Sequence, residues 1–188
     1  MKEYKLELCG VKRVLPFIPI DGKRAFASFM VIGDTEMVSA CAPALAERIG
    51  TVDAIVTAEA KGIALAYEIS RILGLKEFIV ARKSTKNYMR NTVSASLQSI
   101  TTSGEQNLYL DGTDAEKIRG KNVCLLDDVI STGESLLALE ALMKNADASV
   151  VKKAALLAEG EAALRDDIIF LQKLPLFYKT EEGDYEAL

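Results

Sequence analysis

Short apolar runs alternate with segments of helical periodicity from about residue 50 to residue 160, and this alternation constrains the fold more than any other feature. Strands that alternate with helices of this length predict an α/β fold, with an open, mainly parallel twisted sheet and helices on both faces. The runs typical of buried strands are VDAIVTAE (52–59), EFIVAR (77–82), KNVCLLDD (121–128) and VVKKAALLAEG (150–160). The segments with helical spacing are IALAYEISRILG (63–74) and GESLLALEALMKNA (133–146).

The two ends of the chain have a different pattern. The first 50 residues predict two strands and then a helix, and the tail predicts one or two further apolar strands before an acidic end. The expected elements are strands around 4–9 and 24–32, a helix near 35–49 and the apolar stretches of 161–188. No linker long enough to separate a second domain interrupts the sequence, so we expect residues 1–188 to form a single domain.

The segment between residues 83 and 121 lacks a helical pattern. It is polar and alternating, and it contains many residues that favour strands, so it predicts a mobile loop followed by an antiparallel excursion from the main sheet. Gly104 is expected near the hairpin turn of that excursion.

The composition excludes several classes of function. No histidine occurs in the chain, which rules out Ser-His-Asp triads, Cys-His dyads and His-ligated zinc. The net charge of −4 argues against nucleic acid as a partner, and no apolar run approaches the ~20 residues of a membrane span. Cys9, Cys41 and Cys124 are widely spaced in apolar surroundings and predict reduced thiols in a cytoplasmic protein. No two glycines lie two or five residues apart, so neither G-x-G-x-x-G nor a Walker loop occurs.

Two adjacent aspartates, Asp127 and Asp128, end the apolar run of VCLLDDVISTGES (123–135). Two like charges beside a buried strand are costly, so a fold alone would avoid them. Carboxylates accept hydrogen bonds from ribose hydroxyls, whereas a turn that opens a helix offers N–H groups to a phosphate. The pattern therefore predicts a sugar-phosphate site, in which the phosphate lies on the turn formed by Ser131, Thr132, Gly133, Glu134 and Ser135.

VCLLDDVISTGES resembles the phosphoribosyl-pyrophosphate signature of the type I phosphoribosyltransferases. VTAEAKGIALAYEISRILGLKEFIVARK (56–83) is similar to the purine branch of that family and to the purine-repressor effector domain. The resemblance implies a pyrophosphate loop whose backbone amides bind pyrophosphate, often through a cis peptide bond. It also implies a core of about 51–160 and a hood to which about 1–50 and the C-terminal segment contribute. The residues of the implied loop are Glu59, Ala60, Lys61 and Gly62.

The resemblance further implies that basic residues after the second strand contact pyrophosphate and begin a lid that closes over the substrates. The matching cations are Arg82, Lys83, Lys86 and Arg90. The implied reaction transfers the phosphoribosyl group from 5-phosphoribosyl 1-pyrophosphate to a purine base with Mg²⁺ as the cofactor. Asp127 and Asp128 would be the catalytic residues and would hold the metal indirectly, through ribose hydroxyls or water. A homodimer is the usual assembly of the family.

Adenine is the expected base. Enzymes of this family that take 6-oxopurines commonly have a lysine after the strand that follows the signature helix, and LLAEGEAAL (156–164) has Glu159 and Gly160 but no lysine. Acceptors there favour an exocyclic amino group over the oxygens of xanthine, guanine or hypoxanthine.

Two features depart from the adenine enzymes, and other functions stay open. SASLQSITTSG (94–104) has no lid glutamate, so either another group or water takes the proton of the base, as in the xanthine branch, or the protein prefers a different base. A phosphoribosyltransferase for xanthine or another purine therefore stays open. Glu134 must turn its carboxylate away from the phosphate and offer only its N–H group. One alternative is a regulatory domain that binds phosphoribosyl pyrophosphate without catalysis. A phosphoribosyl-pyrophosphate synthase-like or orotate-type protein is a more distant one.

Overall fold

A parallel five-stranded sheet forms the centre of the computed structural model, which describes residues 3–98 and 105–187. Its strands are β4 (Ala54–Ala58), β5 (Ile79–Ala81), β8 (Asn122–Ile130), β9 (Ser149–Glu159) and β10 (Ile169–Leu174), in the order β10-β9-β8-β4-β5. All neighbouring pairs are parallel. The chain leaves β4 toward β5 and later returns to β8 on the other side of β4. Because the strand order reverses there, the two carboxyl ends border a crevice suited to ligands.

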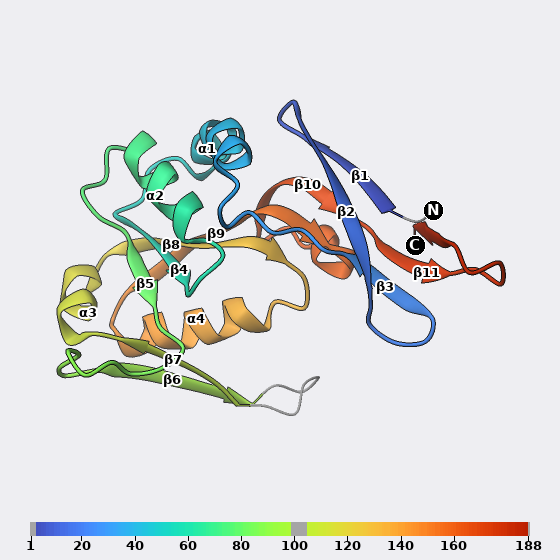
Figure 1. Cartoon of the computed structure of the whole chain (residues 1–188). Helices are drawn as coiled ribbons and strands as arrows, with labels where there is room; N and C mark the ends of the chain where they lie inside the picture. The colour runs from blue at the N-terminus through green and yellow to red at the C-terminus, as the bar shows by residue number, and fades with distance from the viewer. Residues whose placement is uncertain (1–2, 99–104, 188) are drawn as a thin grey trace.

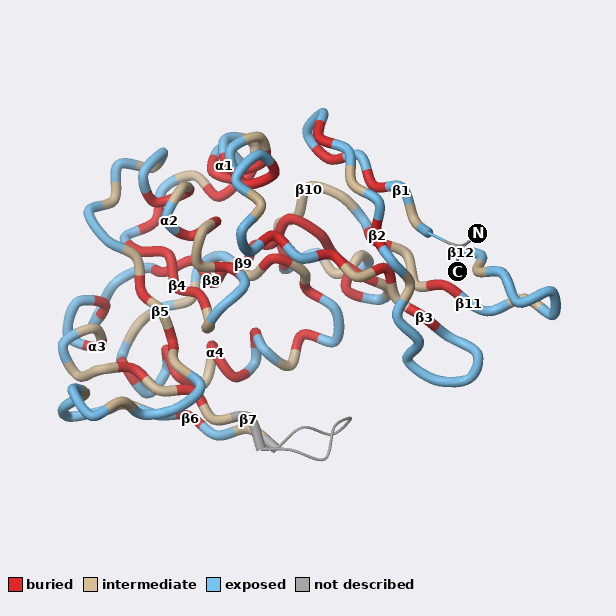
Figure 2. Tube along the Cα trace, in the orientation of Figure 1, coloured by how far each residue is buried: buried red, intermediate tan, exposed pale blue. Residues whose placement is uncertain are grey.

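Helices cover both faces of this sheet, as predicted. Helices α1 (Thr35–Ile49) and α2 (Ile63–Ile72) lie on one face, and α4 (Glu134–Asn145) lies on the other (Figure 1). Strand side chains alternate between two apolar clusters, one on each face of the sheet. Ile55 and Leu126 lie in the cluster that packs against α1 and α2, whereas Val56 and Leu125 lie in the cluster that packs against α4. The central strands are therefore buried on both sides (Figure 2), which explains why they are continuous apolar runs.

The antiparallel excursion is confirmed, but the prediction that residues 83–121 contain no helix is wrong. Strands β6 (Val93–Gln98) and β7 (Glu105–Leu110) pair antiparallel and pack against α4. Helix α3 (Gly112–Ile118) follows them, and Asp111 caps it by accepting a hydrogen bond from Thr113 N at 2.9 Å. Seven residues are too few to give a clear helical period. Gly104, expected near the turn, lies outside the described residues.

A second, antiparallel sheet forms the hood and contains strands from both ends of the chain. Its order is β1 (Glu3–Leu8), β2 (Val11–Pro19), β3 (Arg24–Ala27), β11 (Leu176–Lys179) and β12 (Tyr185–Ala187). The strand predicted at 24–32 ends at Ala27, and β2 was not predicted. Figure 1 shows this sheet beside the main one, with the two termini close together.

Aromatic packing holds the strands of the hood together, and one close contact joins the hood to the rest of the fold. The ring of Phe177 lies 5.2 Å from that of Tyr4 and 4.6 Å from that of Phe17. Leu176 packs against Gly160, in the short 3-10 helix η1 (Gly160–Leu164) that follows β9. The hood therefore meets the carboxyl end of β9. No helix within 3–98 or 105–187 is long and apolar enough to cross a membrane.

Candidate active site

Two turns face each other at the reversal point of the sheet. Residues 59–62 connect β4 to α2, and residues 131–133 connect β8 to α4. Because β4 and β8 are neighbouring parallel strands, their carboxyl ends bring both helix N-termini to the same edge. The N–H groups in the first turn of each helix have no partner within the helix, so this edge offers two adjacent anion-binding ends.

Asp127 and Asp128 lie within β8, which continues to Ile130 instead of ending at residue 128 as predicted. Asp127 accepts a hydrogen bond from Asp128 N at 2.9 Å, and Asp128 accepts one from Val129 N at 3.0 Å. Asp128 is only 2% exposed, yet its Oδ2 atom has no partner in the described part of the chain. A buried carboxylate oxygen without a donor is costly to the fold, so this oxygen calls for a donor from a ligand, a water or an ion.

Burial raises the pKa of Asp127 well above its usual range, and the neighbouring charge of Asp128 raises it further. The ammonium group of Lys61 acts in the opposite direction, which places Lys61 close enough to influence the pair. The two carboxylates thus lie between the two turns, within the electrostatic range of Lys61. Such a perturbed, partly compensated pair is typical of a functional site.

The pyrophosphate loop is shaped by close packing. The peptide bond between Glu59 and Ala60 is cis, which is the arrangement that the family resemblance implies. Gly62 has an ordinary helical φ of −78°, but a Cβ there would collide with Oγ1 of the buried Thr57. Only glycine therefore lets the loop approach β4 closely enough to start α2 at Ile63.

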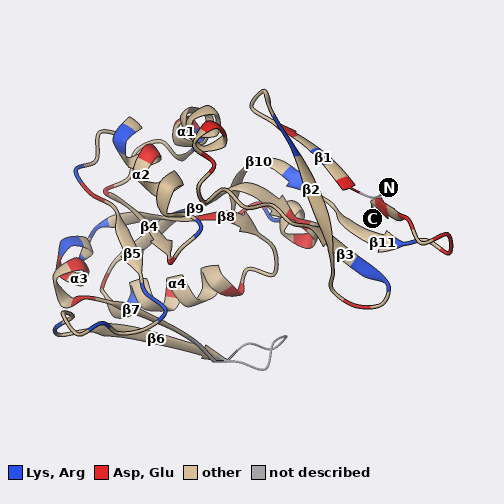
Figure 3. Cartoon of the chain, in the orientation of Figure 1, with Lys and Arg blue, Asp and Glu red and all other residues tan. Residues whose placement is uncertain are grey.

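The predicted cations gather at this loop with one exception. Arg82 donates from Nη1 to Glu59 at 3.1 Å, and the backbone N–H of Lys83 donates to the same carboxylate at 3.1 Å. These contacts, with the charge of Lys86, hold the pKa of Glu59 below its usual range, the Lys83 N–H contributing most. Figure 3 shows the basic segment that follows β5 in blue. Arg90 instead acts on Asp111 at the start of α3.

The phosphate turn adopts its shape through backbone conformation. Gly133 caps α4 with a left-handed φ of +81°, a region that side-chain-bearing residues rarely occupy. Thr132 accepts a long hydrogen bond from Glu134 N at 3.5 Å. Burial raises the pKa of the Glu159 carboxylate and the hydroxyl of Ser131 lowers it, so this hydroxyl faces the end of β9. The structure thus brings the five turn residues together at the start of α4, but directs Ser131 toward β9.

The model of the phosphoribosyl transferase domain family matches residues 33–181. The chain belongs to this family. Among curated relatives, the hypoxanthine/guanine phosphoribosyltransferase of Methanococcus voltae is 34% identical over 116 residues, 61% of this chain and 58% of the relative. The xanthine phosphoribosyltransferase of Clostridioides difficile is 27% identical over 137 residues, 70% of this chain and 71% of that one. The match thus covers 58% of the length of the first of these relatives.

A solved structure agrees with the family assignment. The adenine phosphoribosyltransferase of Thermoanaerobacter pseudethanolicus superposes with a TM-score of 0.68 at 23% identity, covering 85% of this chain and 95% of that one. At that identity the likeness shows the fold alone. The type I phosphoribosyltransferase fold predicted from the sequence is therefore confirmed, including the antiparallel sheet beside the parallel one.

Two charged side chains of this phosphoribosyl transferase domain reach the phosphate turn without having been assigned to it from the sequence. Glu159 ends β9 and is only 8% exposed; burial raises its pKa, while Ser131 and Lys61 oppose that effect. Arg165 follows η1 and lies against Gly133. The strand register pairs Ile130 with Ala158, which makes their successors neighbours. The contact of Glu159 with the phosphate turn thus depends on the register of β8 and β9, which neither strand's sequence reveals by itself.

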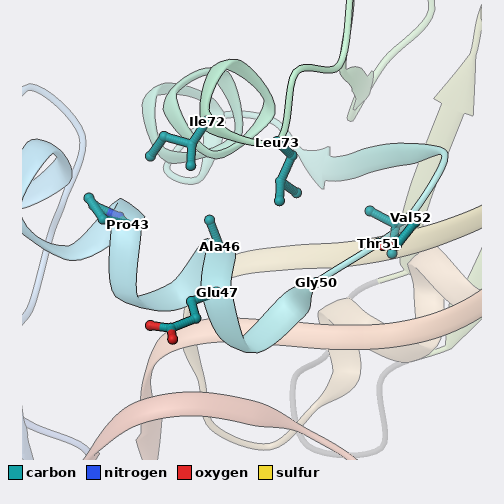
Figure 4. A pocket seen from close by; sticks show the side chains of 8 residues that line it. All are labelled: Pro43, Ala46, Glu47, Gly50, Thr51, Val52, Ile72 and Leu73. Atoms are coloured by element: carbon teal, nitrogen blue, oxygen red, sulfur yellow. The ribbon is translucent and has the colours of Figure 1, made fainter.

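Two pockets lie between α1 and α2, and one of them is separate from the site. A pocket of about 430 Å³ lies between the C-terminal halves of α1 and α2 (Figure 4), and neither turn contributes a residue to it. A second pocket, of about 550 Å³, lies between the N-terminal halves of these helices and includes Ala60 of the pyrophosphate loop. Only the second one adjoins the phosphoribosyl transferase site.

Proposed function

We propose that this chain transfers the phosphoribosyl group from 5-phosphoribosyl 1-pyrophosphate to a purine base, releasing pyrophosphate, as in purine salvage. The observation that carries the proposal is the unpartnered, buried Oδ2 of Asp128 between two helix N-termini. Such a site matches a ligand with hydroxyls in the middle and a phosphate group at each end. The family assignment and the names of the relatives support the same reaction.

The proposed chemistry requires the protein to hold both ends of the donor. The bond between C1′ of the ribose and a pyrophosphate oxygen breaks, and its electron pair leaves with pyrophosphate. A ring nitrogen of the base forms the new bond to C1′ and loses its proton. Asp127 and Asp128 would hold the ribose hydroxyls, while Lys61, Arg82 and Lys83 would neutralise the leaving group. Residues 131–135 would hold the 5′-phosphate.

The residues present fit Mg²⁺ as a cofactor held mainly by substrate. No group of three or more acidic or cysteine ligands occurs within the described residues, so a fully protein-bound metal has no cage there. Asp127 and Asp128 would instead contact hydrated Mg²⁺, a cation that keeps several waters and takes one or two carboxylates plus phosphate oxygens. Bound in this way, the cation would offset charge on the pyrophosphate.

We propose adenine as the preferred base. Glu159, at the end of β9 where the hood meets η1, offers a buried acceptor, which favours the exocyclic amino group of adenine. The names of the relatives point to hypoxanthine, guanine or xanthine, and that of the structural neighbour points to adenine. Glu159 is the observation on this chain that supports the choice of adenine.

We also propose that the protein is a cytoplasmic homodimer. All three cysteines are free, in keeping with a reducing compartment. Met30, Ile32 and Tyr67 are 58%, 44% and 59% exposed, and Ile32 and Tyr67 line the 550 Å³ pocket. A second copy of the chain would cover this apolar face. Light scattering should give twice the monomer mass, and Tyr67→Asp should shift it toward the monomer.

The deciding experiment is pyrophosphate release from the purified protein with Mg²⁺ and phosphoribosyl pyrophosphate. Adenine, hypoxanthine, guanine, xanthine and orotate are supplied separately, and adenine should give the fastest release. Faster release with another base would overturn the choice of adenine but keep the reaction. No release with any base, together with thermal stabilisation by phosphoribosyl pyrophosphate alone, would overturn the reaction and favour the regulatory domain.

A further inference from the structure

Arg165 lies directly against the phosphate turn although it is distant from that turn in the sequence. Its Nη1 atom is 2.8 Å from the point that a Cβ on Gly133 would occupy. Since glycine has no Cβ, the guanidinium rests on the backbone of the residue that caps α4. Figure 1 shows that the segment after β9 comes back beside the start of α4. This contact joins a cation to the turn proposed for the 5′-phosphate.

A carboxylate holds the opposite edge of the same guanidinium. Arg165 donates from Nε to Asp167 Oδ1 at 2.8 Å and from Nη2 to Asp167 Oδ2 at 2.7 Å. Asp167 also accepts from Lys153, which is paired in turn with Glu140 on α4. Two parallel bonds to one carboxylate fix the plane of the guanidinium. Arg165 is therefore held in one orientation, with Nη1 directed away from Asp167.

The Nη1 edge has no acceptor within hydrogen-bond distance in the ranges 3–98 and 105–187. The side chain is about one-third exposed, at 34%, so a ligand can reach it. A cation beside the N-terminus of a helix faces the positive end of the helix dipole, which is unfavourable for the fold alone. An anion bound between the guanidinium of Arg165 and the N-terminus of α4 would be attracted by both, so the repulsion would be offset. The placement is therefore explained by a ligand better than by stability.

We infer that Arg165 is a substrate-binding residue that donates from Nη1 to the phosphate monoester of a pentose phosphate seated on residues 131–135. The inference rests on the proposed function and adds to it. The turn supplies backbone N–H groups, and Arg165 supplies a side-chain cation at this end of the site. Asp167 acts as a positioning residue, because it holds Arg165 without touching the phosphate.

The test measures two ligands separately by calorimetry: ribose 5-phosphate for the phosphate turn and pyrophosphate for the loop at residues 59–62. Arg165→Ala should weaken ribose 5-phosphate about tenfold or more, since a charged hydrogen bond is lost, and change pyrophosphate by less than about twofold. Arg82→Ala should weaken pyrophosphate binding about tenfold or more and change ribose 5-phosphate binding by less than about twofold. Arg71→Ala is the matched control, because Arg71 is also paired with a carboxylate, Glu68, but lies on α2, and it should change neither.

Two further variants test whether Arg165 binds the phosphate directly or only stabilises the structure of the turn. Arg165→Lys keeps the charge and loses the fork, so it should retain part of the affinity for ribose 5-phosphate. Asp167→Asn breaks the network but leaves the guanidinium in place, so it should weaken ribose 5-phosphate by less than Arg165→Ala. Equal losses in Asp167→Asn and Arg165→Ala would show that the network only braces the turn, and would overturn the inference.

The remaining outcomes distinguish this inference from the proposed function. Unchanged ribose 5-phosphate affinity in Arg165→Ala, with normal binding by the wild-type protein, would overturn the inference and leave the proposed function standing. Equal weakening of both ligands would also overturn it, because the effect would then be global. Failure of the wild-type protein to bind either ligand would overturn the proposed function and the inference together.

Discussion

The pyrophosphate loop and the phosphate turn follow neighbouring strands and open helices at the same sheet edge, yet glycine serves them in different ways. At Gly62 the backbone is ordinary and the space is absent, because Thr57 occupies the position of a side chain. At Gly133 the backbone itself is left-handed, with φ +81°. One anion site is thus built by close packing and the other by conformation.

The two turns also differ in how they hold a cation. Arg82 is paired with Glu59, which belongs to the pyrophosphate loop itself, whereas Arg165 is paired with Asp167, outside the phosphate turn. An anion arriving at the loop must therefore compete with Glu59. An anion arriving at the turn meets the free edge of a guanidinium that Asp167 already orients. The comparison teaches that the phosphate end is preformed, while the pyrophosphate end exchanges partners.

The largest expected effect is on the rate of pyrophosphate release, and it comes from the aspartate pair between the two turns. Asp127→Asn with Asp128→Asn should lower pyrophosphate release by about 10³-fold or more, because both acceptors for the ribose hydroxyls lose their charge. Circular dichroism should show an intact fold. Undiminished release would contradict the assignment of the pair, and so would an unfolded double variant.

The next effect separates the two glycines. Gly62→Ala and Gly133→Ala should each destabilise the protein, by about 1–3 kcal/mol for the clash and about 1–2 kcal/mol for the left-handed residue. Adding Thr57→Ala should restore much of the stability of Gly62→Ala, since it removes the clashing hydroxyl. Adding Arg165→Ala should not restore Gly133→Ala, because φ stays positive. Denaturant midpoints of the four variants check this, and equal rescue at both sites would refute the distinction.

A smaller effect tests the competition at the pyrophosphate loop. Glu59→Gln removes the charged partner of Arg82, so pyrophosphate should bind about two- to fivefold more tightly while ribose 5-phosphate is unaffected. The pKa of Glu59 is lowered in the folded state, so its ion pair is present above the unfolded value and is lost as the pH falls. The tighter pyrophosphate binding of Glu59→Gln should therefore vanish at acid pH, because Glu59 of the wild type is then protonated as well. Weaker pyrophosphate binding in Glu59→Gln would mean that Glu59 supports the ligand.

The smallest effect is on stability without ligand. The pKa of Asp127 is raised in the folded state, so its ionisation increasingly destabilises the protein as the pH rises from the unfolded value toward the raised one. Asp127→Asn should therefore become more stable than the wild type as the pH rises from about 4 to 8, and should equal it below about pH 4. Thermal unfolding at both pH values checks the sign. A variant less stable at pH 8 would contradict it.

The parts predicted from the sequence are those with local signals. The alternation of apolar runs and helical periods is a property of short segments, so the parallel core was predictable. The aspartate pair was conspicuous because it conflicts with burial. Within β2 the burial alternates, but Arg13 lies on the inward side and the apolar Val14 and Ile18 are exposed, so the sequence itself shows no period of 2 there. That strand was missed, as was the turn at Cys9 and Gly10, where both residues have positive φ.

The parts not predicted depend on contacts between distant segments. Arg165 reaches Gly133 only because η1 turns the chain back toward α4 after β9, and no local pattern encodes that return. The pairing of Arg82 with Glu59 likewise depends on β5 lying beside β4. The direction of Ser131 toward Glu159 depends on the register of β8 and β9. The residue types predicted a phosphosugar site, but which side chains contact each other within it could be seen only in the folded structure.

The pairing of β3 with β11 sets an order for folding during synthesis. Ala25 pairs with Phe177, so the hood joins residues made before the parallel core to residues made after it. The parallel core needs only segments made between them and can fold first. Until the final strands leave the ribosome, β3 presents an unpaired edge, which is a template for wrong partners. The hood is thus completed only after the core, and β3 is most exposed to wrong partners in the interval before β11 emerges.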